Sequence, residues 1–358
     1  MESLGLKPKN SFWRGKNVII TGHTGFKGCW LAFWLTQLGT KVTGYALDPP
    51  TDPNLFSALE IQKNIIDLRN DIRDLFSLKS AIRSAAPDII IHMAAQSLVR
   101  QSYKDPVSTY ETNVLGTVNI FDACRTCDSV RVILIVTSDK CYENKEVDYS
   151  YGETDPMGGH DPYSSSKGCA ELVTSAFRRS FYNNPSAPAI ASARAGNVIG
   201  GGDWASDRII PDAMRAFSDK QILQVRNPDA IRPWQHVLEP ISGYMTLCEK
   251  MWYEPSKFSK GWNFGPEDES VCTVKEVTDK VSALWGNHAV WTKSNGDHPH
   301  EATLLKLDIT EAKKKLAWIP KWDLDTALEK TVSWYKSYYN GEDIHKMSLE
   351  QINKYQLK

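Results

Sequence analysis

Short hydrophobic runs alternate with longer amphipathic segments through the first half of the chain. The runs are NVIIT (17–21), KVTGYAL (41–47), DIIIHM (88–93), VRVILIV (130–136) and AIASAR (189–194). Between them, segments such as 28–39, 78–86 and 107–125 are helical in character. Runs as apolar as 130–136 are typical of strands covered on both faces. The alternation therefore predicts an α/β fold with a doubly wound parallel sheet.

The pattern changes near residue 195. Segment 196–208, GNVIGGGDWASDR, is rich in glycine, and prolines interrupt the sequence that follows until a helical pattern returns at 274–285. We expect a Rossmann-type domain over 1–195 with a return segment near 230–262. A smaller mixed α/β substrate-binding lobe would comprise 196–229 and 263–358. Ligands of such sheets bind beyond the carboxyl ends of the strands, so the active site is expected in the cleft.

The charge distribution argues against two classes of partner. The formal net charge of the 358 residues is -1, and charged residues are spread along the chain without basic blocks. We therefore expect no nucleic-acid partner and no anionic membrane surface. The N-terminus has no apolar signal-peptide core, and no apolar stretch approaches the ~20 residues of a membrane span. With seven scattered cysteines, these features predict a cytoplasmic protein.

Two cysteines and two histidines could suggest metal sites. Cys124 and Cys127 form a CxxC, but no second pair at zinc spacing accompanies it, so we interpret them as small residues near a helix end. His298 and His300 flank a proline in DHPHE, which is more typical of a loop. We expect no metal. Twelve tryptophans are many for this length, and most of them are expected in the core.

A glycine-rich turn follows the first predicted strand. Gly22, Gly25 and Gly28 have GxxGxxG spacing, and an amphipathic segment follows them. Glycines allow the tight turn and the close approach of a pyrophosphate to the helix N-terminus, whereas the alternative is an ordinary strand-to-helix turn. Asp48 ends the second predicted strand, where a carboxylate can bind ribose hydroxyls, unless it is simply a turn residue before two prolines. These features favour a dinucleotide cofactor, and NAD over NADP.

The exit of the fourth predicted strand carries Ser138, Asp139 and Lys140 in consecutive positions. Farther along, Tyr163 and Lys167 are four residues apart, on one face of a predicted helix. A neighbouring ammonium and an oxidised nicotinamide would each favour the tyrosine phenolate over the phenol, whose free pKa is about 10. Tyr253 and Lys257 repeat this spacing, but Pro255 between them argues against a regular helix there.

With these motifs in order, the chain resembles the extended short-chain dehydrogenase/reductase family over roughly residues 15 to 330. The resemblance rests on TGHTGFKG, NDIRD, HMAAQ, TNVLGT, TSDK and YSSSK. It implies a Rossmann domain that binds NAD, a lobe for a nucleotide sugar, and a catalytic triad of Ser138, Tyr163 and Lys167. Asp71 and Ile72 would flank the adenine. The full set of cofactor contacts would be Gly22, Gly25, Phe26, Lys27, Gly28, Asp48, Asp71, Ile72, Met93, Ala94, Ala95, Thr112, Tyr163 and Lys167.

Within that family, dehydratases of nucleotide-activated hexoses usually carry Asp-Glu after the triad hydroxyl, whereas this chain has Asp139-Lys140. The chain is most similar to the members that act on CDP-glucose. The similarity rests on this departure and on the segments RAGNVIGGGDWASDRIIPD and IRPWQHVLEP. The resemblance implies oxidation at C4, loss of water across C5–C6 and return of the hydride to C6. Asp139, kept protonated by burial, would be the acid, and Lys140 would be the C5 base or an electrostatic stabiliser of the enolate.

The substrate would be held by a further set of side chains. Arginines bind phosphate oxygens well, so Arg208 and Arg232 are candidates for the diphosphate. By resemblance, the full set of substrate contacts would be Gln96, Asn197, Arg208, Arg232 and His300.

Three alternatives stay open at this point. A sugar-nucleotide 4-epimerase would share the triad but has no use for an acid and an amine at C5–C6. A non-catalytic NAD-binding scaffold would not need an intact triad. Asp139 and Lys140 could instead form a salt bridge at a strand end. A homodimer or homotetramer is expected, paired through helices around 107–124 and 164–179.

Overall fold

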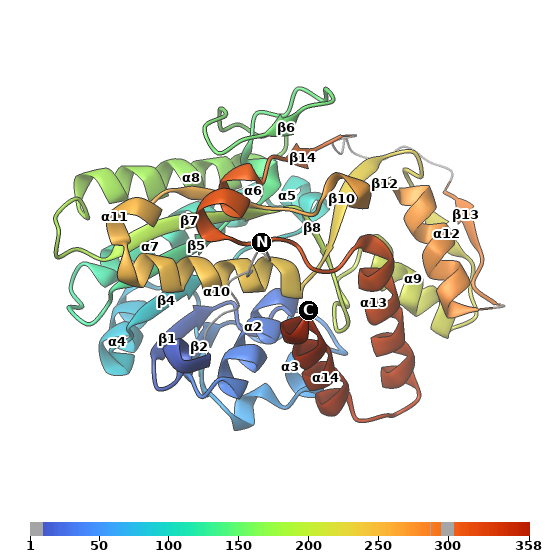
Figure 1. The fold of residues 1–358 in the computed structure, drawn as a ribbon, viewed down its shortest axis with the longest axis horizontal. Coiled ribbons are helices and arrows are strands. Elements are labelled where there is room, and N and C mark those ends of the chain that lie inside the picture. Colours follow the sequence, from blue (N-terminus) through green and yellow to red (C-terminus); the bar gives the residue numbers. More distant parts are fainter. Residues whose placement is uncertain (1–9, 287, 295–303) are drawn as a thin grey trace, which may run out of the picture.

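The computed structural model describes residues 10–286, 288–294 and 304–358. Its centre is a seven-stranded sheet in the order β11-β7-β5-β4-β1-β2-β3 (Figure 1). The strands are β1 (Asn17–Thr21), β2 (Lys41–Ala46), β3 (Ile66–Arg69), β4 (Ile89–His92), β5 (Val132–Val136), β7 (Ala189–Ala195) and β11 (Gly261–Phe264). Every neighbouring pair is parallel, so the predicted doubly wound sheet is confirmed.

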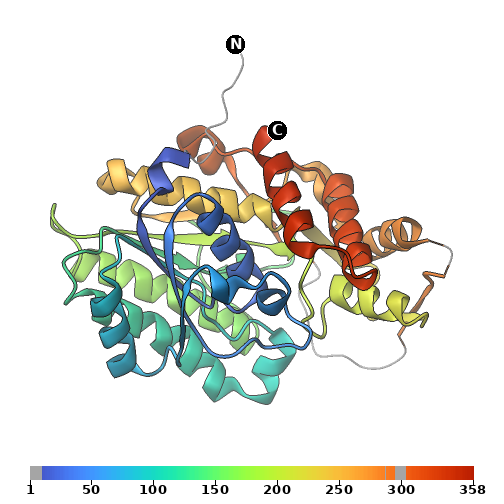
Figure 2. The same cartoon turned by 90° about the horizontal axis from the view of Figure 1, so that it is seen from below.

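Helices cover both faces of this sheet. On one face lie α2 (Phe26–Gln37) and α10 (Leu238–Tyr253), and on the other lie α4 (Leu75–Ala85), α7 (Gly116–Cys124) and α8 (Pro162–Ser180) (Figure 2). Shorter helices and turns are α1 (Asn10–Trp13), α3 (Leu55–Ala58), η1 (Ile61–Lys63), α5 (Val99–Lys104), α6 (Pro106–Tyr110), η2 (Glu111–Leu115), η3 (Asp139–Cys141) and α11 (Pro255–Phe258).

The alternation of side chains along each strand supplies two separate cores. Val18 and Ile20 of β1 point into the core beneath α2, where Trp30 and Trp34 are fully buried. Ile19, between them, points into the core beneath α4 and α7. Because both faces are apolar, the strands appear in the sequence as continuous hydrophobic runs.

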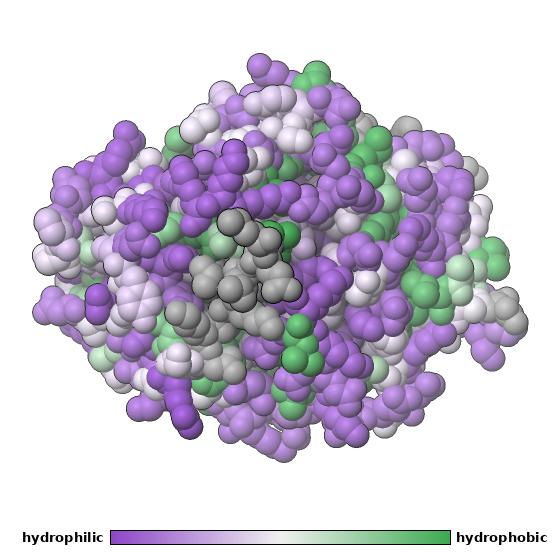
Figure 3. Space-filling model, in the orientation of Figure 1, coloured by the Kyte–Doolittle hydropathy of each residue, from purple (hydrophilic) through white to green (hydrophobic). Residues whose placement is uncertain are grey.

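In the described residues, the proposed smaller lobe contains two short sheets, four helices and two short turns (Figure 1). Its elements are β8 (Asn197–Ile199), β9 (Leu223–Val225), β10 (Ile231–His236), β12 (Val271–Thr273), β13 (Trp291–Lys293), α9 (Ile209–Ser218), η4 (Asp268–Ser270), α12 (Val274–Trp285), η5 (Ala312–Leu316), α13 (Leu324–Tyr339) and α14 (Ile344–Leu357). A further pair, β6 (Ser150–Tyr151) and β14 (Lys306–Leu307), lies beside the large sheet. On the face drawn in Figure 3, hydrophilic residues predominate and hydrophobic ones are scattered.

An aromatic cluster fills the junction between β8 and α13. Trp204 packs edge-on against Trp334 at 5.7 Å and lies 4.9 Å from the ring of Tyr338. The expectation of buried tryptophans holds for Trp204 and Trp334, as it does for most others, whereas Trp285 and Trp291 are only half-buried.

The chain returns to the large sheet after the smaller lobe has begun. Helix α10 packs against β5 and β7, and β11 adds the last strand beside β7. By contrast β10, within the same predicted return segment, pairs with β8 and β12. The division into a Rossmann domain and a substrate lobe stays a proposal, which the position of α10 and β11 supports.

Candidate active site

The glycine-rich turn between β1 and α2 is fixed by contacts that leave no room for side chains. Gly22 has φ +77°, and a Cβ on it would lie 2.7 Å from the amide nitrogen of Ala94. A Cβ on Gly28 would lie 2.1 Å from the carbonyl oxygen of Gly22. Gly25 caps α2 without a side-chain hydrogen bond, so backbone N–H groups remain available at the helix start. This turn fits a dinucleotide pyrophosphate.

A cavity of about 1030 Å³ opens at this turn and extends along the carboxyl ends of the strands into the smaller lobe. It is lined by Gly22, Gly25, Phe26, Lys27, Gly28, Asp48, Asp71, Ile72, Met93, Ala94, Ala95, Gln96, Thr112, Ser138, Asp139, Lys140, Tyr163, Lys167, Asn197, Arg208 and Arg232. These are the site residues predicted from the sequence except His300, which lies outside the described residues. One cavity therefore brings together the cofactor, catalytic and substrate candidates.

Asp48, the residue predicted to bind the ribose, lies next to a network of three residues that the sequence did not single out. The guanidinium of Arg69 is 3.5 Å from the exposed carboxylate of Asp48. Arg69 also donates to Asp67 at 2.8 Å, and Asp67 bonds to Nε2 of the buried His23 at 2.8 Å. Burial lowers the pKa of His23 although Asp67 opposes it, which favours a neutral ring. Asp67 and Arg69 are neighbours on β3, but their contacts with His23 and Asp48 form only when β1, β2 and β3 align.

The catalytic helix α8 begins inside the cavity. Asp161 caps its N-terminus through the amide of Ser164 at 2.9 Å, and Pro162 occupies the first helical position. Tyr163 and Lys167 are therefore both buried in its first turns and face the exit of β5. The ammonium of Lys167 donates to the carbonyl oxygen of Val136 at 3.4 Å.

The protein groups alone do not lower the pKa of Tyr163, and the oxidised nicotinamide that the sequence-based prediction also invoked is not among them. Burial raises the pKa of Tyr163 to about 12, although the hydrogen bond with Ser138 and the charge of Arg208 oppose this rise. Burial lowers the pKa of Lys167 to about 8, against the charge of Glu171. A phenolate at neutral pH therefore needs a further positive charge beside Tyr163.

Asp139 and Lys140 lie in the short turn η3, directly after β5. The side chain of Asp139 is buried and accepts a hydrogen bond from the hydroxyl of Ser138 at 2.8 Å. Among the ion pairs of the described residues there is none between Asp139 and Lys140. The alternative of a mutual salt bridge at the strand end is therefore not what the structure contains.

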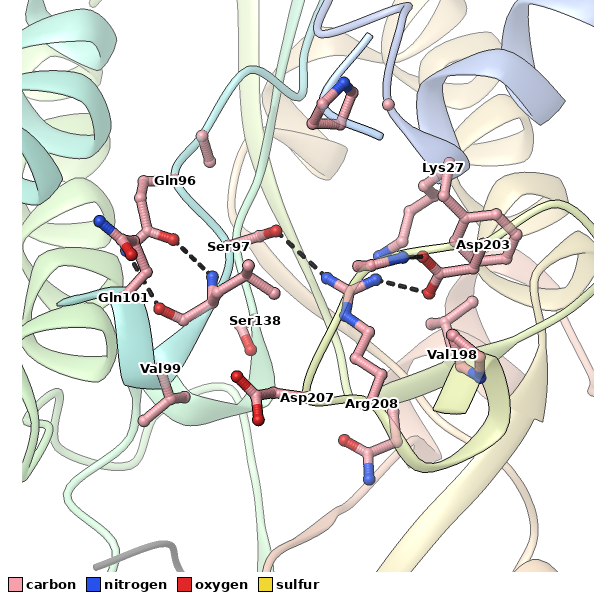
Figure 4. Close-up of a pocket in the computed structure, with 18 of the residues that line it drawn as sticks. Lys27, Gln96, Ser97, Val99, Gln101, Ser138, Val198, Asp203, Asp207 and Arg208 are labelled. Carbon is pink, nitrogen blue, oxygen red and sulfur yellow. Dashed lines mark hydrogen bonds and ion pairs between the residues drawn. The ribbon is translucent and has the colours of Figure 1, made fainter. Parts of the chain in front are cut away.

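At the end of the cavity predicted to hold the substrate, polar contacts join the large sheet domain to segment 203–208. Figure 4 shows the guanidinium of Arg208 between Asp203, at 2.7 Å, and Ser97 of the large domain, at 3.1 Å. The ammonium of Lys27 approaches the same region, and burial, followed by the charges of Lys167 and Arg208, lowers the pKa of Lys27 to about 8. The polar atoms of Gln96 are already bonded to Leu98 and Thr109.

A second cross-cleft contact was missed from the sequence. Asp207, which has φ +63°, bonds through one carboxylate oxygen to Arg100 of α5 at 2.9 Å and also to Arg226 of the smaller lobe. All three line the cavity. Residues 100, 207 and 226 share no motif, so only the folded chain brings them together.

The remaining candidate motifs lie apart from this cavity. Tyr253 is exposed at the end of α10, and Lys257 pairs with Glu254 in α11. Within the described part of the chain, no group of three or more histidine, cysteine or acidic residues could hold a metal, and no helix is long and apolar enough to cross a membrane. His298 lies outside the described residues.

Comparison with known proteins places the chain among sugar-nucleotide enzymes. The family model described as GDP-mannose 4,6 dehydratase matches residues 19–331. The chain is 50% identical over 349 residues to the CDP-glucose 4,6-dehydratase of Salmonella typhimurium strain LT2, covering 96% of this chain and 97% of that one. Two solved structures share the fold. They are an epimerase from Methanothermobacter thermautotrophicus (TM-score 0.80, 23% identity, 94% and 96% of the chains) and the dTDP-glucose 4,6-dehydratase DesIV from Streptomyces venezuelae with NAD bound (TM-score 0.76, 21% identity, 91% and 98%).

Proposed function

Because this chain belongs to the GDP-mannose 4,6-dehydratase family, we propose that it is an NAD-dependent hydro-lyase that converts CDP-glucose into CDP-4-keto-6-deoxyglucose. The observation that carries the proposal is the single cavity that joins the glycine-rich turn to Ser138, Asp139, Lys140, Tyr163 and Lys167. The 50% identity with the Salmonella CDP-glucose 4,6-dehydratase supports cytosine as the base of the nucleotide.

When bound, NAD accepts a hydride from C4 of the sugar and returns it at C6. Tyr163 takes the proton of the 4-hydroxyl, and Ser138 hydrogen-bonds the same oxygen. Lys167 supplies a fixed positive charge one helical turn from the phenol, which favours its ionised form. The backbone of residues 25–28 and the carboxylates of Asp48 and Asp71 would hold the dinucleotide.

The turn after β5 performs the dehydration. The 4-ketone makes the C5 proton acidic, so elimination needs a base at C5 and a proton for the departing 6-hydroxyl. Asp139, buried against Ser138, is the proton donor. Lys140, when neutral, removes the C5 proton, stabilises the enolate as the resulting ammonium, and returns the proton to C5 when the hydride reaches C6. Arg208 and Arg232 bind the diphosphate.

Deuterium at C4 of the glucose tests this proposal. The purified protein with CDP-glucose should give a 4-keto-6-deoxy product whose deuterium has moved within the molecule from C4 to C6. Parallel incubations with dTDP-, UDP- and GDP-glucose test the base. A galacto product that retains deuterium at C4 would assign the protein to the epimerases instead. The absence of any product from all four sugars would overturn the proposal.

We also propose that two copies pair through α6, η2, α7 and α8. Val107 on α6, Leu115 on η2 and Leu172 on α8 are large apolar residues that are more than half exposed, and these helices pack against each other. The parent protein should elute from a sizing column with light scattering at the mass of a dimer or tetramer. The double variant Leu115→Glu/Leu172→Glu should then elute as a monomer. If the double variant kept the mass of the parent assembly, the proposed interface would be contradicted.

The compartment is proposed from the cysteines. All seven are free, and four of them, Cys29, Cys124, Cys141 and Cys248, are buried. Unpaired thiols of this number are typical of a reducing environment, which supports a cytoplasmic site of action.

A further inference from the structure

A buried acid that the proposed mechanism does not use lies directly behind the catalytic residues. Glu171 is on α8, four positions after Lys167, so both side chains lie on the same side of the helix. The side chain of Glu171 is only 5% exposed. It accepts hydrogen bonds from the hydroxyls of Thr137 at 2.5 Å and Ser192 at 2.6 Å, and from Arg194 at 2.8 Å. Three donors thus keep this carboxylate ionised in the interior.

The bond to Thr137 fixes the end of the catalytic strand. Thr137 directly precedes Ser138, and the carbonyl oxygen of Val136 accepts a hydrogen bond from the ammonium of Lys167. The exit of β5 is therefore tied to α8 at two consecutive residues. Because α8 also carries Tyr163, these two bonds set the position of the serine hydroxyl relative to the phenol.

Arg194 carries the same network to the turn that holds the acid and the amine. It donates to the hydroxyl of Tyr142 at 2.6 Å and to the carbonyl of Glu153 at 3.1 Å. Tyr142 follows the η3 turn immediately and donates in turn to Asn263 of β11 at 2.7 Å. The Glu171–Arg194 pair thereby connects α8, β5, β7, β11 and η3.

The titratable groups around Lys167 come from four elements. Glu171 and Tyr163 are on α8, Lys27 is on α2, His92 is on β4, and Cys141 is on η3. Burial lowers the pKa of His92 to about 3, and burial holds the thiol pKa of Cys141 well above its ordinary value, so both are neutral near pH 7. Among these five groups, Glu171 is the anion at neutral pH.

We propose that Glu171, held in place by Arg194, is a positioning residue of the active site, whose carboxylate keeps the Lys167 ammonium charged and anchors Ser138 opposite Tyr163. This inference rests on the proposed function for its catalytic consequence. Its electrostatic part concerns Lys167 alone and can be measured without turnover.

The first test is Glu171→Gln, which keeps the shape of the side chain but removes its charge. The alkaline limb of the kcat profile should move to lower pH by about one unit, because Lys167 then loses its proton more easily. KM for CDP-glucose should change less than about twofold, since Glu171 does not line the cavity. Glu329→Gln, an exposed acid on α13, is the matched control and should leave the profile unchanged.

Arg194 without its partner is a buried unpaired charge and can prevent folding of the single variant. The double variant Glu171→Gln/Arg194→Met removes both charges and should show the same alkaline shift. Thr137→Val removes the hydrogen bond from Thr137 to Glu171 and leaves the bond from Lys167 to Val136 in place. It should lower kcat about tenfold or more without moving the alkaline limb, because a displaced catalytic group lowers the rate without changing the charge on Lys167.

Acetylation of Lys167 by acetic anhydride, followed by mass spectrometry, provides the measurement that does not depend on turnover. Only the neutral amine reacts, so the midpoint of reactivity should move to lower pH in Glu171→Gln and in the double variant. An unchanged midpoint in folded protein would overturn the electrostatic role, and a Thr137→Val variant with parental kcat would overturn the anchoring role. If the parent makes no product but the midpoint still moves, the proposed function fails and the electrostatic role of Glu171 stands.

Discussion

At the scale of single residues, the departure from Asp-Glu to Asp139-Lys140 carries the most chemistry. Both side chains line the cavity beside Tyr163, and the carboxyl of Asp139 is bonded to Ser138. An acid next to the redox hydroxyl can donate a proton to the leaving oxygen, while an amine on the same turn can act at C5. In the proposed mechanism the oxidation and dehydration steps use different residues and can therefore be separated.

Asp139→Asn and Lys140→Ala should each retain NAD binding and reduce NAD in a single turnover with CDP-glucose, because Ser138, Tyr163 and Lys167 are unchanged. Formation of the 4-keto-6-deoxy product should fall by about 10²–10⁴-fold, the range typical of losing a general acid or base. Rapid-mixing absorbance of NADH and product analysis measure the two steps. Tyr163→Phe is the control that should lose both. Near-normal product formation by either variant would remove that residue's role.

The glycine-rich turn offers a sharper steric prediction. Gly28→Ala places a Cβ 2.1 Å from a backbone oxygen, whereas Gly25→Ala places one at 3.5 Å, an ordinary contact, on a residue with φ -82°. Gly28→Ala should lower the free energy of unfolding by about 1–3 kcal/mol, the usual cost of overpacking. Gly25→Ala should change it by less than about 1 kcal/mol. Urea titrations without ligand make the comparison, and equal losses would contradict the steric argument.

Residue chemistry could be predicted from the sequence where motif spacing encodes it. Gly22, Gly28, Ser138, Tyr163 and Lys167 were found in this way and meet in the cavity. The contribution of burial to the pKa of Tyr163 could not be predicted, because it depends on the packing around α8. Asp67 and His23 were missed for a similar reason, since they become neighbours only when β1, β2 and β3 align.

At the scale of elements, long amphipathic segments were predicted well and short strands were not. The apolar spacing of 274–285 coincides with α12, and its Thr273–Glu276 capping box marks the start. The segment 107–125 is one helical run in the sequence but contains the π-helical turn η2 in the structure. Strands β3 (IDLR) and β11 (GWNF) mix polar and apolar residues over only four positions, whereas β4, equally short, was recognised by its run of three isoleucines.

The C-terminal elements are held by a buried acid whose titration should be measurable. Glu239, in the first turn of α10, accepts the amides of Lys321 at 3.1 Å and Trp322 at 2.8 Å, and the hydroxyl of Tyr355 in α14 at 2.7 Å. Burial raises the pKa of Glu239 to about 7 from an ordinary value of 4.5. The folded protein therefore binds this proton more tightly than the unfolded chain does.

The contribution of Glu239 to stability is fully present below about pH 4.5 and is lost as pH rises through about 7. Glu239→Gln keeps an acceptor for the two amides and does not titrate. The free energy of unfolding of the parent, relative to this variant, should therefore fall by about 2–3 kcal/mol between pH 5 and pH 8. Guanidinium titrations at both values give the difference. A parallel pH dependence in the two proteins would contradict the raised pKa.

At the scale of the whole molecule, two polar contacts cross the cleft between the large domain and the smaller lobe. Arg208 bonds to Ser97, and Asp207 bonds to Arg100. Each joins residues about a hundred positions apart in the sequence. The sequence predicted two lobes from the break in pattern near residue 195, but such distant pairs have no local signal.

Asp207 neutralises two guanidiniums that line the cavity, Arg100 and Arg226. Asp207→Asn should make the cavity more positive and lower KM for CDP-glucose by about two- to fivefold at low ionic strength. The reason is that the diphosphate no longer competes with Asp207 for the guanidiniums of Arg100 and Arg226. The effect should shrink in high salt. Asp219→Asn, beyond the end of α9 and absent from the cavity lining, serves as the control. A raised KM would show that Asp207 instead holds the lobes in their binding arrangement.

The aromatic cluster around Trp204 also gives the enzyme a built-in optical probe. The indole of Trp204 forms part of the cavity wall, is 4% exposed, and touches Trp334 and Tyr338 on α13. A sugar that fills the cavity changes the polarity around this ring, so its ultraviolet emission should change with occupancy. Affinities of nucleotide sugars can then be read from fluorescence titrations of variants that no longer turn over, with Trp204→Phe separating its signal from that of Trp234, which also lines the cavity.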